Sequence, residues 1–283
     1  MLKILKNIHP IIAELKEIIR INGSVPPIVL RSLLKEHLQN YVLDFIYESL
    51  KHKDLIFYGG TCLKKIYGLD RMSEDLDFET DLTYDSGDLA KELEGYFFKK
   101  QKFSDVKIKH QNVNSVNRIR LKFPILHKLG LSNNENENLH IKVEINLTEN
   151  LKYPVEVSPL SISKFTIFVK HYDLNTLMAG EMVACIDRSF AKGNANIKGR
   201  DYYDLMWYMQ KEIKPNVDRI RVYKKDWTVK KVFEELDKKV EKINSKDLLI
   251  DLEPFFVKQG YIKTWCENFH NLYEKYRKNY NDN

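Results

Sequence analysis

The stretch Phe57–Thr80, FYGGTCLKKIYGLDRMSEDLDFET, holds most of the chemical signals in this sequence. The apolar run Leu55–Tyr58 predicts a buried strand, which ends at Gly59-Gly60-Thr61. A short helix is expected over Cys62–Tyr67. Glycine allows positive φ and a close backbone approach to a ligand, and the N–H groups at a helix start favour phosphate. This turn therefore indicates an anion-binding site.

The second half of the stretch alternates acidic and apolar residues. Period-two alternation predicts a strand with Asp75 and Asp77 on one face and Leu76 and Phe78 on the other. Such carboxylates lie roughly 6–7 Å apart and, bent inward, can share two divalent ions about 3.5–4 Å apart. Mg²⁺ suits a site of a few carboxylates, water and substrate phosphates. A lone Gly-Gly is usually a turn and a lone Asp-x-Asp a solvated strand edge, but together they predict metal-dependent phosphoryl chemistry.

Length and composition are those of a globular protein. The 283 residues can form one large domain or two small ones, with 43% hydrophobic and 30% charged residues. No apolar run suits a membrane span, and charges interrupt the N-terminus, so neither an anchor nor a signal peptide is expected. The three cysteines predict no disulfide framework or zinc site and indicate the cytoplasm. The net charge of +6 is compatible with RNA or DNA as a partner.

Apolar periodicity predicts helices on both sides of these strands. The expected helices cover 1–22, 28–51, 86–100, 174–189, a segment from 199, 216–224, 228–243, 246–257 and 260–279. Further strands are expected near 106–110, 118–123 and 139–146. Prolines interrupt residues 150–172, which end in an apolar segment, and we place a domain change there. We therefore predict an α/β fold with a core over 1–160 and a helical domain over 161–283.

The same motif resembles a known family. Gly59-Gly60-Thr61 followed by Arg71-x-Ser73-x-Asp75-x-Asp77 is similar to the first motif of AbiEii-type abortive-infection toxins, a branch of the polymerase-beta-like nucleotidyltransferases. Arg188 and Arg200-Asp201-x-x-Asp204 are similar to its later motifs. The resemblance covers about 55–205. It implies a nucleotidyltransferase core with a mixed sheet, followed by a C-terminal helical domain.

A nucleotidyltransferase site needs three carboxylates. Asp75 and Asp77 would bind two Mg²⁺ ions, and Glu144, on the predicted strand over 139–146, is the candidate for the third. Glu144 would assist deprotonation of the acceptor hydroxyl. Its neighbours His140 and Lys142 are expected to be solvated.

The resemblance also implies a nucleotide-binding set. These residues are Gly59, Gly60, Thr61, Arg71, Ser73, Arg200, Asp201 and Asp204. The glycine turn and Ser73 would cradle the triphosphate of an NTP, while Arg71, Arg200 or a nearby lysine neutralises the leaving pyrophosphate. Without the resemblance, Asp201 reads as an acid favoured by the dipole of a helix start.

One position departs from the family pattern. Where the family usually shows a lysine in the helix over 174–189, this chain has Glu181. The role of that lysine is then vacant or belongs to Lys192 or Lys198. The nucleotide preference and the catalytic competence of the chain depend on this position.

The resemblance implies a toxin that transfers NMP from an NTP to an RNA acceptor, a tRNA 3′ end, and that has a cognate antitoxin. Two alternatives stay open. One is a nucleotidyltransferase that acts on a small molecule or a protein side chain. The other is an NTP-binding module with impaired catalysis, consistent with Glu181.

Overall fold

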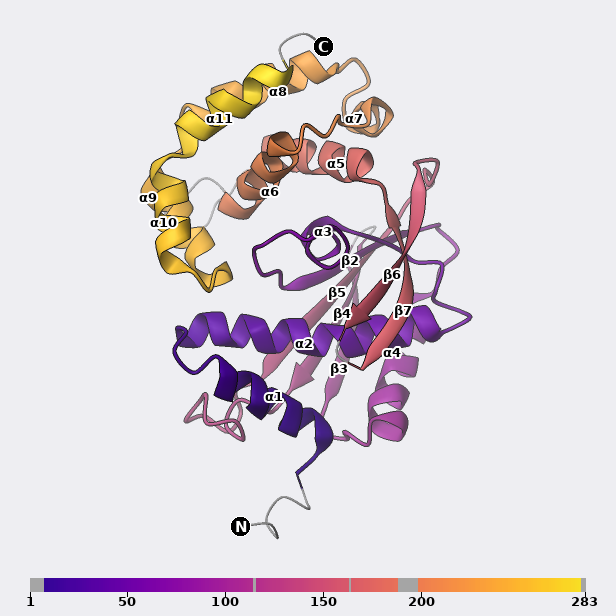
Figure 1. The fold of residues 1–283 in the computed structure, drawn as a ribbon. Coiled ribbons are helices and arrows are strands. Elements are labelled where there is room, and N and C mark those ends of the chain that lie inside the picture. Colours follow the sequence, from indigo (N-terminus) through magenta and orange to yellow (C-terminus); the bar gives the residue numbers. More distant parts are fainter. Residues whose placement is uncertain (1–7, 114–115, 163, 188–197, 281–283) are drawn as a thin grey trace. The chain divides into compact units, whose positions relative to one another are not determined.

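The computed structural model describes residues 8–113, 116–162, 164–187 and 198–280 (Figure 1). Arg188 and Lys192, named above, lie outside these residues. The chain forms two compact units, each described by itself here. Unit 1 comprises Met1–Ile66, Met72–Leu151 and Val157–His171, and unit 2 comprises Tyr67–Arg71, Lys152–Glu156 and Tyr172–Asn283. Two short segments that interrupt unit 1 in sequence therefore belong to unit 2.

Unit 1 is built on a mixed sheet. Its strands in the described residues are β1 (Ile56–Tyr58), β2 (Asp75–Thr80), β3 (Lys107–Val113), β4 (Val116–Phe123), β5 (Leu139–Leu147), β6 (Val155–Ile162) and β7 (Phe165–Tyr172). They lie in the order β3-β4-β5-β2-β1-β7-β6. β2 runs parallel to β5 and β1 parallel to β7, while β1–β2, β3–β4 and β4–β5 are antiparallel. The predicted α/β fold with a mixed sheet is confirmed.

The strands β6 and β7 were not evident from the sequence pattern. Pro159 lies within β6, and proline is tolerated in a strand only where its missing N–H faces no partner. β6 takes such a position at the edge of the sheet. β7 pairs with β1 through His171 and Phe57, a contact between residues 114 positions apart that local periodicity does not reveal.

Helices cover the apolar face of the sheet (Figure 1). They are α1 (Pro10–Ile21), α2 (Pro27–Glu48) and α4 (Ser86–Gly95), the last continued by a π-helical turn at Tyr96–Lys100. The ring centroids of Tyr47 on α2 and Phe78 on β2 lie 6.5 Å apart, and those of Phe97 and Phe123 on β4 lie 5.3 Å apart. Leu76 and Phe78 are fully buried, so the acids that alternate with them lie on the other face.

Unit 2 is helical apart from its short interrupting segments. Its helices in the described residues are α5 (Leu174–Asp187), α6 (Gly199–Gln210), α7 (Val217–Tyr223), α8 (Val229–Val240), α9 (Ser245–Leu252), α10 (Gln259–Glu267) and α11 (Phe269–Arg277). The single helix predicted over 260–279 is wrong. Asn268 ends α10, and its side-chain amide donates to the carbonyl of Thr264 at 2.8 Å. Within the described chain, we find no helix with the length and apolar character of a membrane span.

Candidate active site

The glycine turn lies at the junction of β1 and α3 (Gly59–Tyr67). Gly59 has φ +75°, and a Cβ added there would lie 2.7 Å from Oδ2 of Asp77. Both the backbone conformation and the approach to Asp77 therefore require glycine. The helix begins at Gly59 and not at Cys62 as predicted, so Gly60 and Thr61 belong to its first turn. The structure thus brings this turn directly against one of the predicted metal-binding acids.

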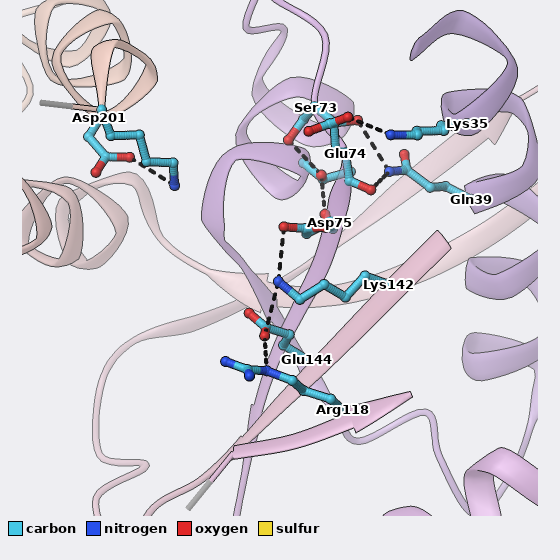
Figure 2. Close-up of polar contacts among 11 residues, drawn as sticks. Lys35, Gln39, Ser73, Glu74, Asp75, Arg118, Lys142, Glu144 and Asp201 are labelled. Atoms are coloured by element: carbon cyan, nitrogen blue, oxygen red, sulfur yellow. Dashed lines mark hydrogen bonds and ion pairs between the residues drawn. The ribbon is translucent and has the colours of Figure 1, made fainter. Parts of the chain in front are cut away.

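Thr61 and Ser73 fix the start of β2 beside that turn. The buried Thr61 hydroxyl lies 2.8 Å from the Ser73 hydroxyl and donates to the backbone carbonyl of Asp75. The Gln39 side-chain amide donates to the carbonyls of Ser73, at 3.2 Å, and Glu74, at 2.9 Å (Figure 2). These contacts give Thr61 and Ser73 a positioning role. Their assignment to the triphosphate stays a prediction.

The three predicted catalytic acids share one face of two neighbouring strands. In the parallel pairing of β2 and β5, Asp77 lies opposite Glu144 and Asp75 lies opposite Lys142. Opposite residues of paired strands project to the same side of a sheet. Asp75, Asp77 and Glu144 therefore project from the face that the helices of unit 1 leave uncovered. The common strand face expected for Asp75 and Asp77 is present and Glu144 shares it, while the metal-binding role of the three acids stays a prediction.

Two cations contact these acids. The Lys142 ammonium lies 3.3 Å from Oδ2 of Asp75 and 3.0 Å from Oε1 of Glu144, and Nε of Arg118 on β4 donates to Glu144 at 2.6 Å (Figure 2). Burial by itself would raise the pKa of Glu144, but the contacts with Lys142 and then Arg118 lower it overall. Glu144 is therefore held in its ionised form.

Contrary to the prediction, the Lys142 side chain is not free in solvent but contacts two of the acids, whereas His140 is exposed as predicted. The sequence did carry a signal for the contact of Lys142 with Glu144. The two residues are two positions apart on one strand, so their side chains share a face. Arg118 had no comparable signal. It reaches Glu144 only through the pairing of β4 with β5, across 26 positions of sequence.

The donor set suits Mg²⁺ in its chemistry. All three acids offer hard oxygen ligands, and Mg²⁺ in phosphoryl-transfer sites commonly uses one or two carboxylates together with substrate phosphates. Among the residues that the structure describes, no group of three His, Cys, Asp or Glu side chains is placed to hold a metal ion. Instead, the ammonium of Lys142 bridges Asp75 and Glu144, so a positive charge already lies between these two carboxylates.

Arg71 and Asp204 form a buried ion pair within unit 2. Nε of Arg71 donates to Oδ1 of Asp204 at 2.6 Å, and Nη2 donates to Oδ2, so the contact is bidentate. The two side chains are 5% and 2% exposed. Burial disfavours the charged guanidinium, but the attraction of Asp204 outweighs it and raises the pKa of Arg71. The pair holds the loop Tyr67–Arg71 against α6, which is a structural role, and nucleotide binding by either residue stays a prediction.

The other predicted residues of unit 2 also have partners. The Lys198 ammonium lies 3.3 Å from Oδ1 of the buried Asp201. The Arg200 guanidinium stacks 4.3 Å from the ring centroid of Phe255, and its backbone N–H donates to Asp251 at 3.2 Å. Lys198 therefore brings a cation to the start of α6, and its possible role in place of the family lysine stays a prediction.

Glu181 belongs to the electrostatic surroundings of Arg71. It is half-buried on α5, and its charge, after that of Asp204, raises the pKa of Arg71. Asp201 acts in the same direction. A lysine at position 181 would repel the buried guanidinium, so the acid at this position is consistent with the Arg71 pair.

The fold is that of the nucleotidyltransferases. The chain is similar to the crystal structure of JHP933 from Helicobacter pylori, with 19% identity, a TM-score of 0.53, and coverage of 87% of this chain and 92% of that one. It is also similar to a crystal structure from H. pylori that is described as a nucleotidyltransferase, with 19% identity, a TM-score of 0.50 and coverage of 87% and 95%. No curated protein matches the chain.

The particular family follows from the sequence match. The model of the family "Nucleotidyl transferase AbiEii toxin, Type IV TA system" matches residues 42–268. This chain therefore belongs to the AbiEii nucleotidyltransferase toxin family, as the motifs in its sequence indicated. Membership of a type IV toxin–antitoxin system implies an antitoxin partner.

Proposed function

We propose that this protein transfers NMP from an NTP to an RNA acceptor, the 3′ end of a tRNA, in a Mg²⁺-dependent reaction. The observation that carries the proposal is the register of β2 and β5. It places Asp77 opposite Glu144, on the strand face beside Gly59. Carboxylates from two strands next to a glycine-bearing helix start combine a cation site with an anion site.

The residues of unit 1 have separate roles in this proposal. Asp75, Asp77 and Glu144 would hold Mg²⁺, which when bound stabilises the charge on the phosphates and activates the acceptor hydroxyl. The backbone of Gly59 and Gly60 orients the triphosphate. Glu144, kept ionised by Lys142 and Arg118, assists removal of the proton from the acceptor hydroxyl. That oxygen then bonds to the α-phosphorus, and pyrophosphate leaves.

We place the reaction in the cytoplasm, where NTPs, tRNA and a cognate antitoxin are available together. The thiols of Cys62, Cys185 and Cys266 are buried and form no disulfide, which fits a reducing compartment. The Type IV system named by the family supports the antitoxin partner.

A second candidate function is NTP binding without efficient transfer. The contacts of Lys142 with Asp75 and Glu144 favour it, since the ammonium competes with Mg²⁺ for the same carboxylates. Glu181 in place of the family lysine favours it as well.

A transfer assay distinguishes these possibilities. The protein is incubated with Mg²⁺ and each α-labelled NTP in turn, with total tRNA, an aminoglycoside mixture or no added acceptor. We expect label in tRNA from one preferred nucleotide. Label in the drug or in the protein itself would show a different acceptor, and NTP binding without label in any acceptor would support the second candidate.

Substitution of the strand acids tests the site itself. Asp75→Ala and Asp77→Ala should each abolish transfer and leave the circular dichroism spectrum unchanged, because both side chains project from the uncovered face of β2. Exposed Asp54→Ala, in the loop before β1, is the matched control. Transfer at the wild-type rate by either β2 variant would refute the metal assignment.

A further inference from the structure

The uncovered face of β3, β4 and β5 is strongly basic. Its six cationic side chains are Lys107, Lys109, Arg118, Arg120, Lys122 and Lys142. They lie on one face because they occupy alternate positions of three strands in mutual register. The other face of the same strands is mainly apolar and includes the fully buried Ile119, Leu121 and Val143.

These cations lie directly opposite one another. Across β3 and β4, Lys107 pairs in register with Lys122, and Lys109 pairs with Arg120. Across β4 and β5, Arg120 pairs with Lys142. Like charges at directly opposed positions destabilise a sheet, while opposite charges there stabilise it. The stability of the sheet therefore does not account for cationic side chains at these opposed positions.

The acids near this face neutralise only one border of it. Arg118 and Lys142 contact Glu144 or Asp75. Lys107, Lys109, Arg120 and Lys122 form no ion pair with any residue that the structure describes. His140, opposite Lys122, shows the resulting field: burial and then the charges of Lys122 and Arg120 lower its pKa.

The basic face continues in register into the candidate active site. The row Lys109–Arg120–Lys142 ends at Asp75, and the neighbouring row from Arg118 passes through Glu144 to Asp77. Strands in a sheet lie about 4.8 Å apart, so β3 and β2 are separated by about 14 Å. A ligand that neutralises the whole face must therefore carry phosphates over a longer path than one triphosphate contacting the acids.

We propose that this face binds the sugar–phosphate backbone of the RNA acceptor and leads its reacting end to Asp75 and Asp77. The inference rests on the proposed function, whose acceptor it places on a defined surface. Lys and Arg side chains that replace the counterions of phosphates supply sequence-independent affinity. Like-charge pairs of this kind are expected on a surface that binds a polyanion.

The test measures RNA binding and stability in the same variants. Fluorescein-labelled single-stranded RNA of 12 nucleotides and total tRNA are titrated by anisotropy into wild type, Lys109→Glu and Lys122→Glu at several KCl concentrations. We expect at least tenfold weaker binding by each variant and a shallower dependence on salt. The unfolding temperature should stay the same or rise, because each substitution places an acid opposite Arg120 or Lys107.

Two controls separate this inference from its alternatives. Lys91→Glu makes the same charge change at an exposed position of α4, which packs on the opposite side of the sheet, and should bind RNA as wild type does. Asp77→Asn should keep RNA binding while losing transfer, so that failure of the catalytic proposal and failure of this one are distinguishable. ATP binding should be equal in wild type and Lys109→Glu.

Several outcomes would overturn the proposal. One is RNA binding by Lys109→Glu and Lys122→Glu equal to that of Lys91→Glu. Another is competition by polyglutamate as strong as that by RNA of equal charge, which would indicate an acidic protein partner. A loss of ATP binding in Lys109→Glu would assign the face to the nucleotide, and a lowered unfolding temperature in both variants would assign the cations to structure.

Discussion

Two arginine–carboxylate pairs in this protein have the same chemistry and different surroundings. In unit 2, Arg71 and Asp204 are 5% and 2% exposed and joined by two hydrogen bonds. In unit 1, Arg118 is 43% exposed and Glu144 18% exposed. One hydrogen bond joins them, and Lys142 contacts the same oxygen of Glu144. The first pair excludes water and the second remains accessible to it.

This difference in exposure to water gives the two ion pairs different roles, one structural and one in ligand binding. A buried ion of this kind cannot change partners, since loss of its counter-charge leaves an uncompensated charge in the interior. A half-exposed pair is weak and screened by salt, so a metal ion or a phosphate can replace either partner at little cost. The Arg71 pair therefore suits the fixing of a loop, and the Arg118–Lys142–Glu144 group suits the exchange of ligands.

The largest effect is expected from the buried pair. Asp204→Ala should lower the free energy of unfolding by about 3–5 kcal/mol, because it leaves the guanidinium of Arg71 unneutralised. Urea unfolding followed by tryptophan fluorescence measures this, since Trp207, Trp227 and Trp265 all lie in unit 2. Exposed Asp218→Ala on α7 is the control, with about 0.5 kcal/mol or less. Unchanged stability with weaker NTP binding would instead favour the predicted nucleotide-binding role.

A half-buried cation, Lys65, extends the comparison, because it has no bonded carboxylate. The ammonium of Lys65 on α3 donates to Asn40 at 2.7 Å and to the carbonyl of Glu36 at 3.3 Å, and burial lowers its pKa from 10.5 to about 8. The folded state then binds fewer protons than the unfolded state between these pH values, so stability should rise as pH increases from about 8 to 10.5. Below pH 8 the full penalty remains.

Replacement of Lys65 should remove both the free-energy penalty of the buried charge and the rise of stability with pH. Lys65→Met is expected to raise the free energy of unfolding at pH 7 by about 3 kcal/mol, since the lowering of the pKa from 10.5 to about 8 corresponds to about 1.4 kcal/mol per unit, and to lose the rise between pH 8 and 10.5. Urea unfolding followed by circular dichroism at several pH values measures it. Exposed Lys53→Met serves as the control and should keep the wild-type pH dependence. A less stable Lys65→Met would show that the hydrogen bonds outweigh the burial of charge.

Substitution of Lys142 tests whether its ammonium and Mg²⁺ compete for Asp75 and Glu144. Lys142→Met removes the ammonium between Asp75 and Glu144, so Mg²⁺ should bind about tenfold more tightly, equivalent to about 1.4 kcal/mol. The Mg²⁺ concentration that half-saturates the shift in unfolding temperature reports this independently of transfer. Unaltered or weaker Mg²⁺ binding would contradict the proposed site.

The smallest effect is expected at Arg118. Arg118→Gln should change the free energy of unfolding by less than about 1 kcal/mol, and the change should shrink further in high salt. Urea titrations at low and high KCl, followed by circular dichroism, provide the measurement. A loss as large as that of Asp204→Ala would remove the distinction between the two pairs.

Several features of the site could be predicted from the sequence because they are local. The alternation around Asp75 and Asp77 fixes their common face whatever the surrounding fold. Gly59 marks a position where a side chain is excluded, although only the structure shows that Asp77 excludes it. The family motifs could also be recognised in the sequence, because they are short runs with fixed spacing.

The features that could not be predicted join distant segments. The contact of Lys142 with Asp75 could not be predicted, because a strand pattern does not identify the neighbouring strand. The pairing of Arg71 with Asp204, 133 positions away, likewise joins distant segments. The edge strand β6 could not be predicted because its proline argues against a strand. Proline is compatible with a strand at the edge of a sheet, and only the structure shows that β6 lies there.

By itself, the sequence determined the fold class, the family and the common strand face of Asp75 and Asp77. Each of these depends on residue type and short-range periodicity. Tertiary structure alone decided which cation lies between Asp75 and Glu144, which arginine is buried, and where a basic face meets the acids. Those outcomes follow from strand register and burial, because they set the distance between charges and the access of water, and neither quantity is local in the chain.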